Sequence, residues 1–441
     1  MSHILIIGNG IAGITCARHL RKRSNDQITV VSAETVHFFS RTALMYIYMG
    51  HMKYEHTKPY EDFFWSKNRI ELVYQYVSAV DTEKKLVHLK DHSSISYDKL
   101  ILATGSVTQK FNWPGQDLKG VQGLYSYQDL ESMELETKNI QQAVIVGGGL
   151  IGIEMAEMLH TRNIPVTMLI RDDRYWASVL PPREAALVAR QIERNGIRLI
   201  YDSQIKEIIG DATGKVSKVI TTKGESINCQ FVGIATGVKP NISLTKDSKI
   251  KTDKGILVNE YFETNCPDVY AIGDCAQFTT EPEGRKKIEQ VWYTGRMHGE
   301  TLALTLTGKR SPYRPGPWFN SAKFFDLEYQ TYGLVSGKLN EGEKYFYWQH
   351  PKKEIGFGIV YHGDSKQLKG VNSYGMRLRH EYFDRWLKEK CTVEIMLSRL
   401  DQALFDPEFV KNHVSGIISA YNVETNSSVE RKKTVFSFLR S

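Results

Sequence analysis

Two copies of a glycine-rich phosphate-binding pattern constrain this chain more than any other feature of its sequence. The first copy, GNGIAG at residues 8–13, follows the mostly apolar run 3–7, and the second, GGGLIG at residues 147–152, follows the apolar run 143–146. In this pattern the first glycine permits a tight turn, the second lets the backbone approach a pyrophosphate, and the third lets the next helix pack on the strand. The helix N-terminus then offers free N–H groups to the phosphates. The sequence therefore predicts two dinucleotide sites.

Two dinucleotide sites in one protein favour an oxidoreductase in which hydride passes from a nicotinamide to a flavin, because the cofactors carry the redox chemistry. The protein then supplies binding, orientation and electrostatics, and the half-reaction strictly requires no catalytic side chain. The loop residues that we expect to contact cofactors are Gly8, Gly10, Ile11, Ala12 and Gly13 in the first copy and Gly147, Gly149, Leu150, Ile151 and Gly152 in the second.

Composition agrees with a globular enzyme. The chain has 441 residues, enough for about three domains, and 41% of them are hydrophobic and 24% charged. No apolar run approaches the ~20 residues of a membrane helix, and the first strand is expected within three residues of the start, which leaves no room for a signal peptide. We therefore expect a cytoplasmic protein without a transmembrane segment. The net charge of +7 fits either an acidic partner or a general gain in solubility, and we expect no nucleic-acid partner.

The five cysteines are scattered along the chain and form no C-x-x-C pair. This spacing suggests neither a disulfide framework nor a zinc site, and we expect no metal. We interpret the cysteines as reduced, mostly buried thiols of a cytoplasmic protein. Because no thiol pair has redox spacing, we predict that catalysis needs no cysteine.

A second repeated motif supports a tandem architecture. The stretch 97–105 is an apolar strand that ends in Ala103-Thr104-Gly105, and the stretch 231–237 ends in the same three residue types, with Thr236 and Gly237. A loop with Pro and Gly at 113–115 is a candidate boundary between the two copies. From residue 312 onward aromatic and β-forming residues increase, which predicts an antiparallel sheet followed by helices at about 380–420.

The predicted fold class is α/β, with two tandem Rossmann-like dinucleotide-binding domains and an α+β C-terminal domain. We expect a discontinuous first dinucleotide-binding domain at 1–115 and 246–316, a second dinucleotide-binding domain at 116–245, the C-terminal domain at 317–425, and a basic flexible tail at 426–441. The chain returns to the first domain through a strand at 268–272, which ends in Gly273-Asp274 and is expected to open a helix. Asp274 can accept hydrogen bonds from a sugar-alcohol hydroxyl.

These motifs, in this order, resemble those of the pyridine-nucleotide-dependent flavoprotein oxidoreductases with two dinucleotide-binding domains. The resemblance covers roughly residues 1–340 and is strongest to the ferredoxin-, rubredoxin- and putidaredoxin-reductase branch. It implies the glutathione-reductase-like architecture, with FAD on the first domain and NADH or NADPH on the second. Within the C-terminal domain, 317–321 also resembles the start of this branch's third domain.

The resemblance assigns further residues to FAD. Glu34, at the end of the second strand, would bind the adenine ribose, Arg41 matches an arginine of the flavin-contacting loop, and Val77 would meet the adenine through its backbone. The turn that contains Ala103, Thr104 and Gly105 and the pair Gly273 and Asp274 would complete the site, with Asp274 on the ribityl chain. Asn320 stands where many relatives have an aromatic residue, so Trp292 or Trp318 could take that role beside the flavin.

The chain also departs from its relatives. Disulfide reductases have a cysteine pair after the first domain, and peroxide and oxygen reductases have a single cysteine in the loop that here spans 38–42; neither is present. Electron-transfer reductases usually have a lysine shortly after the position of Arg41, where this chain has Leu-Met-Tyr at 44–46. The charge around the flavin therefore differs from the family pattern.

The sequence leaves the choice of nicotinamide open. The family places a ribose-binding acid at Ile170, which cannot act as one, and Arg171 follows, which can hold a 2′-phosphate. Asp172 and the NAD-type third glycine, Gly152, argue for NADH, so we predict NAD(P)H with a slight preference for NADPH. In relatives Glu154 faces the same region.

Three hypotheses follow for the electron acceptor. The favoured one is a small iron–sulfur or rubredoxin-type protein, acidic in character. A quinone or small-molecule reductase is the second, because the basic tail at 431–438 could dock on an anionic membrane. The third is a redox-sensing binding protein, in which NAD(P)H changes shape or oligomeric state. The sequence leaves the oligomeric state open, with a homodimer among the options.

Overall fold

The protein is described here by a computed structural model that covers residues 1–405 and 411–432. Its residues form two compact units, each assembled from three separate segments. The first unit comprises Met1–Gly147, Met158–Ile164 and Ile205–Pro315, and the second comprises Gly148–Glu157, Pro165–Gln204 and Gly316–Ser441. The domain that we predicted at 116–245 is thus divided between the units. The predicted tail lies outside the described residues from 433 onward.

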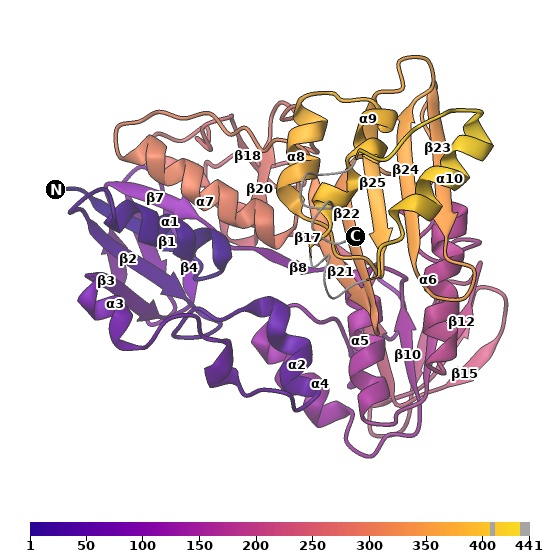
Figure 1. Ribbon diagram of the computed structural model, residues 1–441. Helices are drawn as coiled ribbons and strands as arrows, with labels where there is room; N and C mark the ends of the chain where they lie inside the picture. Colours follow the sequence, from indigo (N-terminus) through magenta and orange to yellow (C-terminus); the bar gives the residue numbers. More distant parts are fainter. Residues whose placement is uncertain (406–410, 433–441) are drawn as a thin grey trace. The chain divides into compact units, whose positions relative to one another are not determined.

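A five-stranded parallel sheet forms the centre of the first unit (Figure 1). Its inner strands are buried on both faces, which explains why the first reads as an unbroken apolar run: Ile4, Leu5 and Ile6 are 0% exposed. The strand that comes last in the sequence, Val269–Ala271, joins this sheet by pairing with Lys99–Leu102. In spatial order the strands are β19 (Val269–Ala271), β7 (Lys99–Leu102), β1 (His3–Ile7), β2 (Gln27–Ser32) and β3 (Ile70–Tyr74).

Two helices, α1 (Ile11–Arg21) and α7 (Trp292–Leu306), pack closely on each other beside this sheet (Figure 1). Small residues make the close approach possible. A Cβ added at Gly299 would lie 2.5 Å from the carbonyl oxygen of Ala12, and one at Gly295 would lie 3.1 Å from Ile11. The contact holds α1, which begins at the first glycine loop, against α7, which follows much later in the sequence.

Smaller sheets complete the first unit. Strand β16 (Phe231–Ile234) pairs in parallel with both β10 (Ala143–Val146) and β9 (Val121–Gln122). The remaining strands are β4 (Val77–Asp81), β5 (Leu86–Leu89) and β6 (Ser94–Ser96); β13 (Ile205–Gly210), β14 (Val216–Thr221) and β15 (Ser226–Asn228); β8 (Ser106–Thr108) with β17 (Val238–Pro240); and β18 (Ile256–Val258) with β20 (Ala276–Phe278).

Short helices and turns connect these strands. The prediction of a helix directly after Asp274 is wrong. A single 3-10 turn, η4 (Gly273–Cys275), is followed by strand β20, because the backbone is extended again from Ala276. The other elements are η1 (Arg41–Ala43), α2 (Leu44–Tyr48), η2 (Tyr54–Thr57), α3 (Phe63–Lys67), α4 (Tyr127–Glu136), η3 (Ser243–Thr245) and α5 (Leu150–Thr161), the last of which crosses from the second unit into the first.

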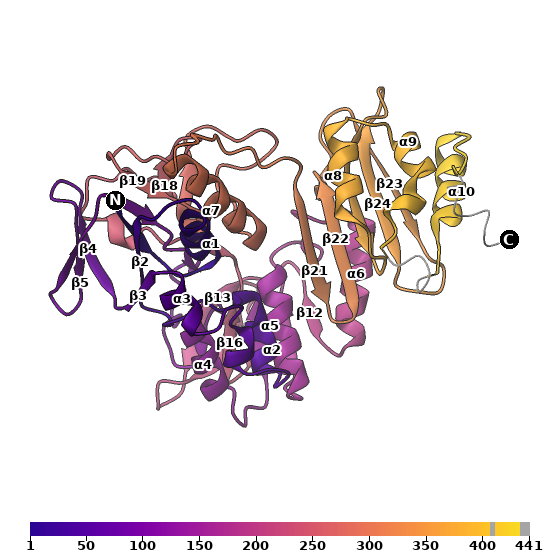
Figure 2. The ribbon, with the colours of Figure 1, turned by 60° about the vertical axis from the view of Figure 1, so that its left-hand side comes forward.

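The second unit contains the antiparallel sheet that the aromatic-rich segment predicted. The sheet has the order β21-β22-β25-β24-β23, with α8, α9 and α10 on one face and α6 on the other (Figure 2). The strands of this sheet are β21 (Phe319–Phe324), β22 (Leu327–Gly333), β23 (Glu343–Gln349), β24 (Gly356–His362) and β25 (Leu368–Tyr374). The other elements of the second unit are β11 (Val166–Leu169), α6 (Pro182–Arg194), β12 (Arg198–Ile200), α8 (His380–Lys388), α9 (Val393–Ser398), η5 (Leu400–Ala403) and α10 (Val414–Thr425).

A buried carboxylate joins α6 to this sheet. Glu184 is 0% exposed, and its Oε1 accepts a hydrogen bond from the hydroxyl of Tyr345 at 2.8 Å. Its Oε2 accepts from the amide of Asn372 and from the hydroxyl of Tyr374. Gly358 makes room for the carboxylate, because a Cβ at this position would overlap Oε1. Burial raises the pKa of Glu184 to about 7, against the lowering effect of the three hydrogen bonds.

Candidate functional site

The three glycines of the first loop have distinct structural roles. Gly8 has φ +113°, and a Cβ there would overlap the carbonyl oxygen of Ala103, so only glycine fits. A Cβ at Gly13 would overlap the carbonyl oxygen of Gly8, which requires glycine where helix packs on loop. A Cβ at Gly10, in contrast, would have no atom within 4 Å. Packing thus explains the first and third glycines, and the second lies on the open side of the loop.

The second loop repeats this construction. Gly147 has φ +112°, and a Cβ there would overlap the carbonyl oxygen of Ala235. A Cβ at Gly149 would have no atom within 4 Å. Ala103 and Ala235 belong to the repeated Ala-Thr-Gly turns, so each glycine loop is built against the corresponding turn. The first glycine of each loop therefore packs against the alanine carbonyl of the corresponding turn.

The helices that follow the loops begin without a competing acid. The first turn of α1, which contains Ile11 and Ala12, has no acidic residue, and its N-cap Gly10 has no side-chain cap. The first turn of α5, which begins at Leu150, has none either. Uncapped N–H groups at a helix N-terminus favour a phosphate. Later in α5, burial and the nearby Glu157 raise the pKa of Glu154 to about 7.

The threonines of the two turns serve the backbone. The Thr104 hydroxyl donates to the carbonyl of Asn241 at 2.7 Å, and the Thr236 hydroxyl donates to the carbonyl of Gln109 at 2.8 Å. These bonds fix the antiparallel pair β8–β17, which follows the two turns. Gly105 and Gly237 both have positive φ, at +71° and +106°, as the turns require. The hydroxyls of Thr104 and Thr236 thus hold β8 to β17.

Glu34 and Arg41, which the sequence suggested as separate contacts, form one ion pair. The guanidinium of Arg41 donates to both carboxylate oxygens of Glu34, with Nη1–Oε1 at 2.7 Å. The backbone N–H of Tyr127 also donates to Oε1 at 2.9 Å. Burial lowers the pKa of Arg41, but the hydrogen bonds and charge of Glu34 outweigh burial and raise it. The start of α4 therefore belongs to this site, which sequence reasoning missed.

Asp274 lies in a network that the sequence did not reveal. Its Oδ2 accepts from the hydroxyl of Ser106 at 3.1 Å and from the hydroxyl of Tyr125 at 3.2 Å. Its Oδ1 has no hydrogen-bond partner within the described ranges 1–405 and 411–432. Burial raises the pKa of Asp274, and the two hydroxyls and the charge of Arg41 oppose this rise. Gln290 extends the network, because its amide donates to the Ser106 hydroxyl at 2.7 Å.

A buried histidine accepts a hydrogen bond from the turn before Asp274. Gly273 has φ +73°, and its N–H donates to Nδ1 of His298 at 3.1 Å. His298 is 2% exposed, and burial and the charge of Arg285 lower its pKa to about 3. The imidazole therefore remains neutral and keeps its acceptor nitrogen.

Two further predicted residues lie at the ends of elements. Val77 is the first residue of β4 and is buried, as its expected backbone role allows. Trp292 is the first residue of α7, is half-buried, and meets Tyr293 edge to face at 5.5 Å. Trp318 lies in the second unit, just before β21. The role of Trp292 or Trp318 beside the flavin stays a prediction.

The arginines after β11 differ in their freedom. Arg171 is exposed and pairs with Asp172 at 3.2 Å. Arg174 donates to the carbonyls of Ala177 and Gly337 and is held by the backbone of its own unit. Arg171 is thus the more available of the two for a 2′-phosphate, with Asp172 as its present partner.

All five cysteines are free thiols, and four of them are buried. Burial raises the pKa of Cys229 to about 12 and that of Cys16 further still. A raised pKa leaves little thiolate, which is the reactive form. The prediction that catalysis needs no cysteine remains to be tested.

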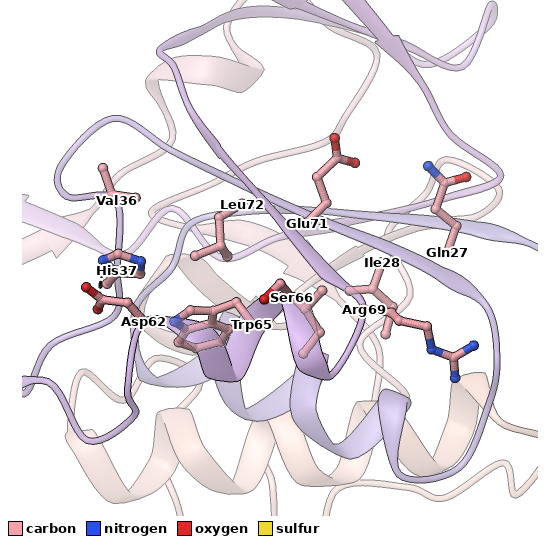
Figure 3. A pocket seen from close by; sticks show the side chains of 11 residues that line it. Gln27, Ile28, Val36, His37, Asp62, Trp65, Ser66, Arg69, Glu71 and Leu72 are labelled. Carbon is pink, nitrogen blue, oxygen red and sulfur yellow. Dashed lines mark ion pairs between the residues drawn. The ribbon is translucent and has the colours of Figure 1, made fainter.

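A pocket of the first unit lies apart from these residues. It is formed by β2, β3 and α3, and none of the predicted cofactor residues lines it. Figure 3 shows Trp65 and Ser66 of α3 facing the strands, with His37 and Asp62 paired at one end at 3.4 Å. Its residues do not form part of the candidate site. Among residues 1–405 and 411–432, no helix has the length and apolar character needed to cross a bilayer.

The two strand–loop–helix motifs, each built against an Ala-Thr-Gly turn, define the class of oxidoreductases that bind two dinucleotides. The chain belongs to the pyridine nucleotide-disulphide oxidoreductase family, whose characteristic sequence matches residues 2–299. FAD and NAD(P)H are the cofactors of this class.

Named relatives refine this placement. The chain is 30% identical over 311 residues to the NADH-rubredoxin oxidoreductase of Clostridium acetobutylicum, across 70% of this chain and 76% of that protein. It is 31% identical over 277 residues to the nitrite reductase (NAD(P)H) of Bacillus subtilis, across 62% of this chain and 34% of that protein, so it spans about a third of that relative. The crystal structure of the ferredoxin reductase for the CYP199A2 system from Rhodopseudomonas palustris has the same fold, with a TM-score of 0.77, 24% identity, and coverage of 85% and 91%.

The residues of the first unit fit a flavin dinucleotide. The open side at Gly10, the uncapped start of α1 and the free Oδ1 of Asp274 supply donors for a pyrophosphate and an acceptor for a sugar-alcohol hydroxyl. A flavin dinucleotide needs donors for its pyrophosphate and an acceptor for its sugar alcohol, and the first unit contains both.

Proposed function

We propose that the protein is an FAD-dependent NAD(P)H oxidoreductase that reduces a small iron–sulfur or rubredoxin-type protein. The observation that carries this proposal is the duplicated loop, in which packing fixes the first glycine and leaves the second open, at Gly10 and at Gly149. The relatives named for rubredoxin and ferredoxin reduction support the choice of acceptor. When bound, FAD would take hydride from NAD(P)H and release electrons to the acceptor.

The chain's own residues would bind and orient the cofactors. On this proposal Gly8, Gly10 and Gly13 shape the pyrophosphate site of FAD, and the N–H groups at the start of α1 donate to it. Oδ1 of Asp274 accepts a hydrogen bond from a ribityl hydroxyl. The pair Glu34–Arg41 would lie at the adenine ribose, where the remaining lone pairs of the carboxylate serve as acceptors.

The second loop would bind the nicotinamide dinucleotide in the same manner. Gly147 and Gly149, with the start of α5, would receive its pyrophosphate. Arg171 would exchange Asp172 for a 2′-phosphate when NADPH binds, because a charge-assisted hydrogen bond to phosphate is stronger than an exposed ion pair. With NADH the existing pair would persist.

Anaerobic reduction followed by an acceptor screen tests this function. The purified protein should be yellow, and NADH or NADPH should bleach the flavin absorbance in the absence of oxygen. Rubredoxin, a [2Fe–2S] ferredoxin and a soluble quinone are then added in turn, and flavin reoxidation is followed in each case. Rapid reoxidation by an iron–sulfur or rubredoxin-type protein supports the proposal.

Other results would redirect it. Reoxidation by the quinone alone would indicate a quinone reductase, and lipid pelleting before and after removal of the basic tail would then test membrane docking. A flavin that is reduced but passes electrons to no acceptor would indicate a redox-sensing protein. Colourless protein that does not take up added FAD would reject the proposal.

The number of electrons taken up tests the role of cysteine. We expect an anaerobic dithionite titration to consume two electrons per flavin, because the five thiols are free and no pair has redox spacing. A requirement for four electrons would reveal a redox-active disulfide. In that case the protein would be a disulfide reductase.

A further inference from the structure

Tyr125 lies beside Asp274, although 149 residues separate them in the sequence. Its hydroxyl donates to Oδ2 of Asp274 at 3.2 Å and accepts the backbone N–H of Ser106 at 2.9 Å. The hydroxyl of Ser106 donates to the same Oδ2 and accepts from Gln290. The direction of every hydrogen bond in this network is therefore defined, and both protein donors reach the same carboxylate oxygen.

Neighbouring groups fix Tyr125 from two sides. The guanidinium of Arg41 lies 4.6 Å from the centroid of its ring, within cation–π distance, and donates to its carbonyl. At the hydroxyl end of the ring, Gly105 has φ +71°, and a Cβ at this position would lie 2.7 Å from the Tyr125 hydroxyl oxygen. Glycine at 105 thus makes room for that hydroxyl.

We propose that Tyr125 is a positioning residue for the flavin cofactor. Together with Ser106 it binds Oδ2 of Asp274, fixes the plane of the carboxylate and leaves Oδ1 to accept a hydrogen bond from the ribityl chain. The inference rests on the proposed function, because it assumes that Asp274 binds FAD. It deepens that function by naming the residue that orients the acceptor.

The same network opposes protonation of the acceptor, although burial still raises the pKa of Asp274. The groups that face Asp274 are the cation of Arg41, the hydroxyls of Tyr125 and Ser106, and the buried thiol of Cys275 next to it in the chain. Without the Tyr125 hydroxyl, one of two donors that oppose the effect of burial is lost, so Asp274 would take up a proton at a higher pH. A protonated carboxyl would no longer serve as the same acceptor.

The test is the pH profile of FAD binding. The dissociation constant is measured by flavin fluorescence from pH 5.5 to 8.5 for the wild type, Tyr125→Phe and Ser106→Ala. We expect Tyr125→Phe to weaken binding about tenfold at neutral pH, the loss of one hydrogen bond to a charged group, and to weaken it further as the pH falls. Ser106→Ala should act in the same direction, because its hydroxyl donates to the same oxygen.

Two controls separate orientation from general damage. Tyr74→Phe alters an exposed tyrosine of β3 in the same unit and should leave the profile unchanged. Asp274→Asn in the Tyr125→Phe background should abolish the extra pH dependence, because the titrating group is gone. The flavin midpoint potential of each variant, measured with redox dyes, gives a second readout that needs no electron acceptor.

The outcomes are distinguishable. A Tyr125→Phe profile parallel to the wild type, whether shifted or not, would overturn the inference while the proposed function stands. A wild-type protein that binds no FAD would overturn the proposed function itself.

Discussion

Two carboxylates of this protein accept hydrogen bonds from tyrosine hydroxyls, yet they differ in how many of their oxygens are paired and in their exposure. Glu184 in the second unit uses both oxygens, with three donors from the antiparallel sheet. Asp274 in the first unit uses one oxygen, and both of its protein donors reach that atom. Glu184 is 0% exposed, whereas Asp274 is partly accessible.

The difference teaches how to tell a structural acid from a binding acid. A carboxylate whose oxygens both accept hydrogen bonds from the protein and whose side chain has no exposed surface is closed to a ligand and stabilises packing. A carboxylate with one free, accessible oxygen retains an acceptor at a defined position. Both side chains are carboxylates whose pKa burial raises, so the number of partners on each oxygen and the exposure of the side chain separate them. The predictions below test this distinction.

Removal of the Glu184 carboxylate, which is closed to ligands, should have the largest effect on free energy. Glu184→Ala leaves the donors of Tyr345, Asn372 and Tyr374 without their acceptor and adds a cavity, so we expect the second unit to lose about 3–5 kcal/mol of stability. Urea denaturation and hydrogen exchange of α6 and β25 measure this loss. Glu193→Ala, an exposed acid on the same helix, is the matched control and should change stability by less than about 0.5 kcal/mol. Equal effects of the two variants would contradict the closed-site interpretation.

A pH series should sharpen the same point. The pKa of Glu184 is about 7 in the folded protein against an ordinary value of 4.5. Between these values the folded protein holds a proton that the unfolded chain has released, so stability falls as pH rises through this window, by about 3 kcal/mol in total. Glu184→Gln cannot titrate and should lack this dependence. Hydrogen exchange of β25, corrected for intrinsic rates, compares the two proteins from pH 5 to 8, and parallel profiles would be evidence against the raised pKa.

The open carboxylate should affect binding more than folding. Asp274→Ala removes an acceptor for FAD, so we expect the dissociation constant to rise about tenfold to a hundredfold, equivalent to about 1–3 kcal/mol. Flavin fluorescence measures the change, with the exposed Asp247→Ala of the same unit as control. If Asp274→Ala bound FAD as tightly as the wild type but lowered the stability of the protein, Asp274 would be a structural acid like Glu184.

The smallest effect is expected at a charge pair in solvent. Arg171→Ala should raise the Michaelis constant for NADPH roughly tenfold and leave that for NADH nearly unchanged, because Arg171 would contact only the 2′-phosphate. Arg198→Ala, an exposed arginine of β12, is the control. An equal change for both nucleotides would show that Arg171 does not read the 2′-phosphate.

The parts of the site that the sequence predicts are local. The glycine loops, the strands before them and the repeated Ala-Thr-Gly turns each occupy a short stretch, and fixed offsets identify them. The hydrogen-bond partners are distant instead: Tyr125 reaches Asp274 across 149 residues, and Asn372 reaches Glu184 across 188. No periodicity encodes such pairs. One signal was present, because Gly358 interrupts a strand, which often marks a close approach of another group.

The late arrival of β19 in the chain has a consequence for synthesis on the ribosome. The first glycine loop emerges before the second, but β19, which pairs with β7 and leads into Asp274, emerges only after the whole second loop and its strands. Until then the edge of β7 lacks its neighbour, and an unpaired edge strand is a site of aggregation. On the proposed assignment, the flavin site that begins before the second glycine loop is thus completed after it, and a nascent chain that stops before residue 274 would lack the acceptor for its cofactor.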